Sequence, residues 1–208
     1  SPRAMRNGII VTVLFACLIG SALLFYAGWE LIIVGLLCVL FAFLYTTGPY
    51  PLSYNGWGDV LVIVFFGFVP VGGTYYVQAL TWTSDTTVAS LICGLLIDTL
   101  LVVNNYRDRE ADARSGKRTV IVRFGEKFGR YLYLMLGVAA SLLCFWFFFE
   151  GHVFAALLPL LYLIPHVLTW RRMVQIHSGK KLNSILGETS RNMLLMGILL
   201  SIGFLIRH

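Results

Sequence analysis

The chain has 208 residues, of which 58% are apolar and only 12% are charged, and its mean hydropathy is +0.81. A soluble domain has about half apolar and about a quarter charged residues, so this composition excludes a soluble domain, and it equally excludes a disordered, collagen-like or disulfide-rich chain. The formal net charge of +6 would suggest nucleic-acid binding in a soluble protein, but in a membrane protein basic residues first report topology.

Seven apolar runs approach the roughly 20 residues that a helix needs to cross a bilayer. The second, fourth and seventh are short, and the fourth must extend into its polar flanks to span. The pattern predicts an all-α, polytopic membrane helical bundle that forms one integral membrane domain over residues 1–208. The four cysteines lie inside such runs and are interpreted as small core residues. The runs are Gly8–Gly28, Leu31–Tyr45, Val60–Leu80, Val88–Val103, Tyr131–Phe149, Val153–Trp170 and Met193–Ile206.

Basic residues divide unequally between the two sides of this predicted bundle. If all seven runs span, 15 of the 16 lysines and arginines fall on one side. The positive-inside rule makes that side cytoplasmic, with the N-terminus inside and the C-terminus outside. The segments expected there are Thr46–Asp59, Asn104–Arg130 and Arg171–Asn192. The basic residues of the last segment favour orientation and contact with anionic lipid over nucleic-acid binding.

The most informative segment follows the fourth run. If the helix continues beyond the bilayer, Asn104, Asp108 and Asp112 recur every four residues and form one ridge of oxygen-bearing side chains. Stacked carboxylates repel each other unless a cation lies between them, and hard oxygen ligands suit Mg²⁺ bridged to a substrate phosphate. Donors suited to a diphosphate come next, at Lys117, Arg118 and Arg123. The alternative is a solvated loop whose acids are neutralised by the neighbouring arginines, Arg107, Arg109 and Arg114.

Asp98 is a second anomaly, because it lies about two turns inside the fourth run. An unpaired acid at that depth costs several kcal/mol, so it is expected to face a polar cavity. On a helical wheel Asp98 lies about 20° from Asn105, so both side chains fit one cavity wall. A hydrogen-bonded packing acid is an equally good interpretation.

Three motifs together resemble the UbiA superfamily of intramembrane prenyltransferases. They are GPYPLSYNGWGD, FFGFVPVGGTYY and NNYRDREADARSGKRT, in that order along the chain. The resemblance implies an all-helical fold of nine membrane helices around a central cavity. It also implies two acidic motifs that bind a polyprenyl diphosphate with Mg²⁺.

The resemblance assigns roles to individual residues. Asn104, Asp108 and Asp112 correspond to the second acidic motif and would hold the metal. Asp108, Asp112 and Lys117 would carry the catalysis. Further polar side chains would contact the substrates. Arg118 and Arg123 would bind the diphosphate, and Asn105 would line the cavity wall. Tyr45, Tyr54 and Asp59 would lie near the acceptor.

One feature departs from the family pattern. The first acidic motif, of the N-D-x-x-D kind, is absent upstream of Arg6, and the chain matches the family from just before its third helix. We therefore expect an N-terminally incomplete sequence that lacks two helices and half of the metal site, and that is inactive alone.

The implied reaction transfers a polyprenyl group from polyprenyl diphosphate to 1,4-dihydroxy-2-naphthoate, with loss of carboxylate and diphosphate, to give demethylmenaquinone. It would take place at the cytoplasmic side of a bacterial cytoplasmic membrane. Two alternatives stay open. One is a related prenyltransferase with another aromatic acceptor; the other is a helical-bundle transporter, which would need ionisable residues along several helices.

Overall fold

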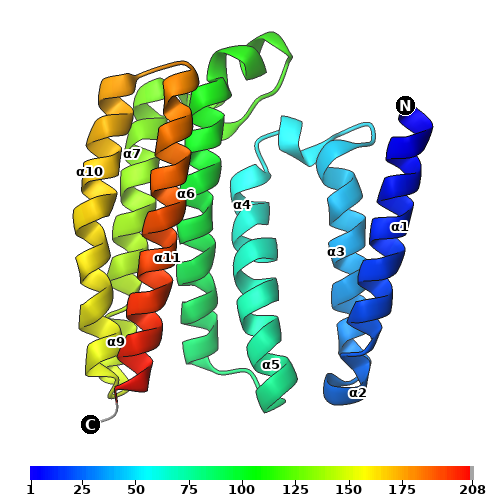
Figure 1. Cartoon of the computed structure of the whole chain (residues 1–208), viewed down its shortest axis with the longest axis vertical. Helices are drawn as coiled ribbons and strands as arrows, with labels where there is room; N and C mark the ends of the chain where they lie inside the picture. The colour runs from blue at the N-terminus through cyan, green and yellow to red at the C-terminus, as the bar shows by residue number, and fades with distance from the viewer. Residues whose placement is uncertain (207–208) are drawn as a thin grey trace.

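The computed structural model describes residues 1–206, and all regular structure in that range is helical. Figure 1 shows the helices running side by side, with α6, α7, α10 and α11 in one group, α4 beside α6, and α1 and α3 at the far side. The predicted all-α bundle is thereby confirmed. The elements are α1 (Pro2–Ser21), α2 (Leu24–Ala27), α3 (Glu30–Thr46), η1 (Leu52–Tyr54), α4 (Gly58–Val62), η2 (Ile63–Gly72), α5 (Gly73–Ala79), α6 (Ser84–Arg114), α7 (Val120–Leu143), α8 (Trp146–Phe149), α9 (Val153–Leu157), η3 (Leu158–Tyr162), α10 (Leu163–Ile176), η4 (Lys180–Leu182) and α11 (Asn183–Leu205).

Six helical segments in the described range are long and apolar enough to cross a membrane, and Glu30–Thr46 is apolar but shorter. The seven predicted runs therefore each correspond to a helical segment. The segments predicted on the basic side are partly helical, because the neighbouring helices continue into them. Between Asn104 and Arg130 only residues 115–119 lie outside α6 and α7, although α7 has a non-helical residue at Gly125.

The fourth run, which looked short, forms the longest helix of the described chain. α6 has 31 residues, and the Thr83 side chain caps it by accepting a hydrogen bond from the Thr86 amide. It ends at Ser115, whose amide bonds back to the Ala111 carbonyl. The helix thus continues beyond the apolar run into the polar residues at both ends, as the short length of that run led us to expect.

The segment from Gly58 to Ala79 packs against α6 at very short range. A methyl group on Gly67 would lie 2.5 Å from the Ser90 carbonyl oxygen, and one on Gly94 would lie 3.0 Å from the Ile63 backbone. Small residues let membrane helices approach closely, which strengthens van der Waals packing where no hydrophobic effect acts between helices. This segment is π-helical over Ile63–Gly72, and Pro70, which cannot donate a backbone hydrogen bond, lies inside it.

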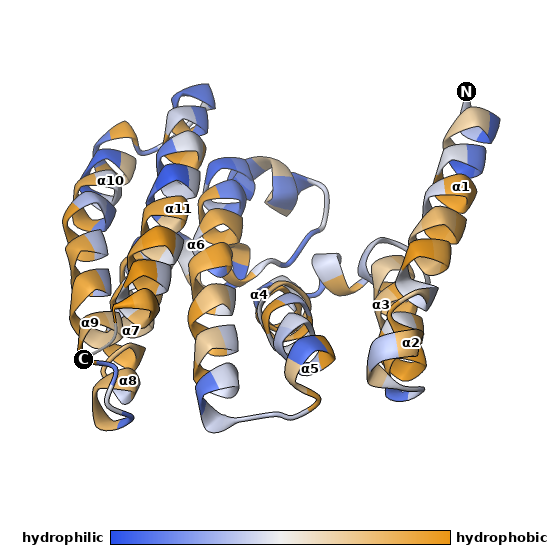
Figure 2. Ribbon diagram, turned by 60° about the horizontal axis from the view of Figure 1, so that its bottom comes forward, coloured by the Kyte–Doolittle hydropathy of each residue, from blue (hydrophilic) through white to orange (hydrophobic). Residues whose placement is uncertain are grey.

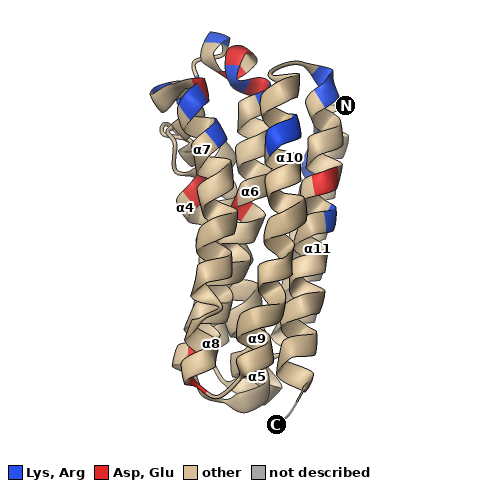
Figure 3. Ribbon diagram, turned by 90° about the vertical axis from the view of Figure 1, so that its left-hand side faces the viewer, with Lys and Arg blue, Asp and Glu red and all other residues tan. Residues whose placement is uncertain are grey.

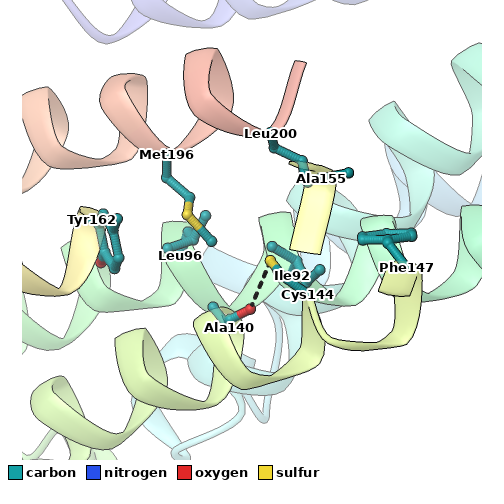
Figure 4. Packing of buried hydrophobic residues seen from close by; sticks show 9 residues of the cluster. All are labelled: Ile92, Leu96, Ala140, Cys144, Phe147, Ala155, Tyr162, Met196 and Leu200. Atoms are coloured by element: carbon teal, nitrogen blue, oxygen red, sulfur yellow. Dashed lines mark hydrogen bonds between the residues drawn. The ribbon is translucent and has the colours of Figure 1, made fainter. Parts of the chain in front are cut away.

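Most of the buried core lies between α6, α7, α10 and α11. In Figure 4 Met196 of α11 reaches toward Leu96 of α6, Leu200 lies beside Ala155, and Ile92 lies beside Cys144, whose thiol donates to the Ala140 carbonyl. A second cluster around Val102, Tyr106, Tyr133 and Met173 fills the other half of the bundle. α6 contributes to both clusters and so forms the centre of the packing.

The outer surfaces are apolar, as Figure 2 shows for α1 and α3 in particular. α1 has no buried residue, and Phe15, Leu18 and Ile19 are exposed on it. Such a surface suits lipid hydrocarbon. The interpretation of all four cysteines as core residues is wrong for Cys17, which is exposed on α1, whereas Cys144 is buried. The hydrophobic pattern of the sequence does not distinguish a cysteine that faces lipid from one in the protein core, because both environments are apolar.

Lysines and arginines gather at one end of the bundle, where α10 meets α11 and α6 meets α7 (Figure 3). We call this the basic end and define it by residues 104–130 and 171–192. The N-terminus lies at the same end, and the α8–α9 turn lies at the opposite end (Figures 1 and 3). This is the partition that the sequence predicted from the apolar runs.

Candidate active site

Two connections meet at the basic end. The first, between α3 and α4, contains Pro49 and Pro51, which prevent a regular helix, and it folds into the short helix η1. The second joins α6 to α7, where Gly116 adopts a φ of +79° and the Lys117 amide bonds to the Asp112 carbonyl at 2.9 Å. Thr119 then caps α7 by accepting from the Val122 amide.

Backbone contacts fix these two connections to each other. The Arg118 amide donates to the Tyr54 carbonyl at 2.7 Å, and the Arg123 guanidinium donates to the Asn55 carbonyl at 2.7 Å. Gly56 has a φ of +81°, and a Cβ there would lie 2.9 Å from the Arg118 carbonyl oxygen. Only glycine suits both the conformation and the close approach, so this position holds the connections together.

A cavity of about 420 Å³ lies beneath the joined connections. Its wall combines aromatic rings from the first connection with amide, carboxyl and ammonium groups from α4, α6 and the second connection. A mixed apolar and polar lining of this size is typical of a small-molecule site. The lining residues are Tyr45, Thr46, Ser53, Tyr54, Gly56, Gly58, Asp59, Leu101, Asn104, Asn105, Lys117 and Thr119.

The oxygen ridge on α6 is present and is bridged by a guanidinium. Arg107 donates to Asn104 Oδ1 at 2.7 Å and to the two carboxylate oxygens of Asp108 at 2.8 and 2.6 Å. Its remaining nitrogen donates to Asn183 Oδ1 at 2.9 Å, which joins α6 to α11. The Arg107 guanidinium therefore lies between the oxygens of Asn104 and Asp108, where the sequence analysis expected a metal ion.

Asp112 completes the ridge and faces the second connection. Its carboxylate lies 3.2 Å from Lys117 Nζ, and the residue is only 7% exposed. Lys117 Nζ also lies 5.4 Å from the centre of the Tyr54 ring, within the range of a cation–π contact. Lys117 thus connects the ridge, the cavity and the first connection.

The predicted site residues separate into three groups. Six of them line the cavity: Tyr45, Tyr54, Asp59, Asn104, Asn105 and Lys117. Asp108 and Asp112 lie on the ridge next to it, whereas Arg118 and Arg123 hold the connections and are exposed at the rim. The predicted neutralisation of acids by arginine holds for Arg107, but Arg109 pairs instead with Glu126, at 3.4 Å.

The sequence predicted Arg107 only as a residue that neutralises the acids, and its bond to Asn104 was not predicted, although the two residues are three positions apart. The sequence also did not predict Ser53, Leu101 and Thr119 as cavity residues. Leu101 carries no chemical signal in the sequence, and it is found only through its place one turn below Asn105.

The donor set suits a hard divalent ion only in part. Within residues 1–206 no group of three or more His, Cys, Asp or Glu side chains lies close enough together to hold a metal ion. The ridge supplies two carboxylates and one amide oxygen, and Mg²⁺ is commonly bound by one or two carboxylates, with waters and substrate phosphates completing its shell. The chemistry of the ridge therefore fits a metal that arrives together with a diphosphate.

The polar cavity, the carboxylates and the basic groups at one end of this polytopic bundle are chemically suited to binding an anionic ligand at the membrane surface. The chain belongs to the UbiA prenyltransferase family, which matches residues 1–202. No solved structure matches the chain.

Curated relatives share much of the sequence. A 1,4-dihydroxy-2-naphthoate octaprenyltransferase of Haemophilus influenzae is 36% identical over 99% of this chain and 69% of its own length. Enzymes of the same name from Escherichia coli and Bacillus subtilis are 38% and 26% identical, over 68% and 100% of this chain and 48% and 67% of their own lengths. The match thus spans between about half and about two thirds of these relatives.

Proposed function

We propose that the chain carries the active site of an aromatic prenyltransferase that transfers a polyprenyl group from its diphosphate to 1,4-dihydroxy-2-naphthoate. The observation that carries this proposal is the cavity at the basic end, where Lys117 and Asn104 bring the carboxylate ridge to the cavity wall. The names of the relatives supply the acceptor. Membership in a prenyltransferase family favours this function over the transporter that the sequence left open.

The diphosphate would bind where the ridge meets the second connection. Lys117, Arg118 and Arg123 are the donors for its oxygens, since charge-assisted hydrogen bonds from lysine and arginine suit phosphate groups. Asn104, Asp108 and Asp112 would hold Mg²⁺, which when bound neutralises the charge that develops on the departing diphosphate. Because Arg107 bonds to Asn104 and Asp108, its guanidinium must turn away before an ion binds there.

The acceptor would occupy the cavity between the two connections. Tyr45, Tyr54, Asp59 and Asn105 present polar groups suited to its hydroxyl groups. During the reaction the bond between the prenyl carbon and the diphosphate oxygen breaks, and the naphthoate ring forms a bond to that carbon. The ring carboxylate leaves as carbon dioxide, and its bonding electrons restore the aromatic ring.

We further propose that the basic end faces the cytoplasm, in keeping with the positive-inside rule. In a cysteine-free variant of the chain, a cysteine at Arg114, which is exposed at the basic end, should react with a membrane-impermeant maleimide only after the cells are permeabilised. A cysteine at Glu150, exposed at the opposite end, should react in intact cells. The reverse labelling pattern would overturn the orientation.

The function is tested by transfer of a radiolabelled polyprenyl group in membranes that contain the chain. We expect labelled product with 1,4-dihydroxy-2-naphthoate, and loss of at least about 90% of it after removal of divalent ions with EDTA, because the departing diphosphate then lacks its counter-charge. Added Mg²⁺ should restore it. Equal transfer to 4-hydroxybenzoate would favour a different acceptor, and full activity in EDTA would exclude the metal.

A further inference from the structure

Asp98 has no role in the site described so far, yet its position is unusual. It is 1% exposed on α6, one turn below Leu101, and its Oδ1 atom is buried without a hydrogen-bond partner among residues 1–206. A buried acid without a partner is expensive within a membrane. Either a donor or an acceptor must therefore satisfy this carboxyl group.

The helix register identifies the partner. α6 runs antiparallel to the segment from Gly58 to Ala79, as Figure 1 shows. Gly67 meets Ser90, and one turn further along Ile63 meets Gly94. One more step of four residues on each helix places Asp59 opposite Asp98, and the Gly58–Leu101 contact follows directly above. Asp59 is also close enough to act electrostatically on Asp98.

Two further groups approach the same place. The Tyr45 hydroxyl lies 3.5 Å from where a Cβ on Gly58 would be, and Asp59, Asp98 and Lys117 all act on it electrostatically. The acids of the other packed helices are already paired: Glu188 of α11 with Arg172, and Glu126 of α7 with Arg130. Lys117 is engaged by Asp112, and among residues 1–206 no basic side chain pairs directly with Asp98.

Two carboxylates that face each other in a dry environment cannot both ionise, so such a pair holds a proton. Asp59 lines the cavity, whereas Asp98 lies behind it. Asp59 can therefore contact a ligand in the cavity, and Asp98 can contact the side of Asp59 that faces away from the cavity.

We propose that Asp98 is a positioning residue whose protonated carboxyl group donates a hydrogen bond to Asp59 and so holds Asp59 ready to accept a hydrogen bond from a hydroxyl group of the aromatic acceptor. This inference rests on the proposed function and adds a determinant of acceptor binding to it. It requires that substitution of Asp98 weakens binding of the acceptor and does not change binding of the prenyl diphosphate.

Steady-state kinetics of three variants test the role. Asp98→Leu, which has no hydrogen-bonding group, should raise the KM for the acceptor about tenfold, which corresponds to the loss of a hydrogen bond to a charged group, and leave the KM for the prenyl diphosphate unchanged. Asp98→Asn retains a donor and should stay within about threefold of the native KM. Ser90→Ala, which removes another unpartnered buried oxygen from the same face of α6, is the matched control and should change neither value. Equal effects on both substrates, or no effect of leucine, would overturn the proposal.

Infrared spectroscopy of the purified chain provides a readout that does not depend on activity. The native protein at neutral pH should show the C=O stretch of a protonated carboxyl group, which Asp98→Asn removes and Ser90→Ala retains. A spectrum that Asp98→Asn leaves unchanged would overturn the shared proton. If the band behaves as expected but the native protein transfers no prenyl group to the naphthoate, the proposed function fails and the carboxyl pair stands.

Discussion

Asp108→Ala and Asp112→Ala are expected to lower prenyl transfer by about 10²–10³-fold, the usual cost of removing one group that stabilises transition-state charge. Both carboxylates belong to the ridge beside the cavity, and both are engaged by a cation already, Asp108 by Arg107 and Asp112 by Lys117. These pairings show that the oxygens are accessible to a positive charge. The measurement is turnover with radiolabelled polyprenyl diphosphate at saturating Mg²⁺.

The control must separate chemistry from folding. Glu110→Ala removes an exposed acid from the same helix, between the two ridge residues, and should leave turnover within about twofold, as expected for a surface change. Asp108→Ala leaves Arg107 bonded to Asn104 and Asn183, so its melting temperature should stay near the native value. Asp112→Asn serves as a second variant that retains the buried volume. Undiminished turnover in both alanine variants would remove the ridge from the active site.

The sequence predicted the helical segments of the bundle because these depend on local information. Apolar runs of bilayer length must be helical. The four-residue spacing places Asn104, Asp108 and Asp112 on one face provided that the helix continues through them. The continuation of α6 to Arg114 satisfied that condition.

What the sequence missed depends on contacts between distant segments. The bond from the Arg118 amide to the Tyr54 carbonyl involves only backbone atoms, so no side-chain pattern reports it. The facing of Asp59 and Asp98 depends on how the two helices pair, and the register is set by the glycines between them. Pro70 does not reveal the local helix type in the sequence, because a proline inside a helix is compatible with a kink or with the observed π-helix.

The glycine contact between η2 and α6 leads to the second large expected effect. Gly67→Ala should destabilise the protein by about 1–3 kcal/mol, the usual cost of overpacking, because the new methyl group would lie 2.5 Å from the Ser90 carbonyl oxygen and 2.8 Å from Gly94 Cα. Both neighbours are backbone atoms and cannot rotate away. For a chain of this length each kcal/mol corresponds to roughly 2–4 °C in Tm.

Gly73→Ala is the matched control, since it lies six residues further along the same segment, is helical, and has nothing within 4 Å of its would-be Cβ. Alanine there should leave Tm unchanged or raise it slightly, because it lowers the backbone entropy of the unfolded chain. Thermal unfolding in detergent measures both. Because the same contact sets the pairing of Asp59 with Asp98, Gly67→Ala should also raise the KM for the acceptor more than the KM for the diphosphate. An unchanged Tm in Gly67→Ala would contradict the close packing, and with it the register on which the carboxyl pair depends.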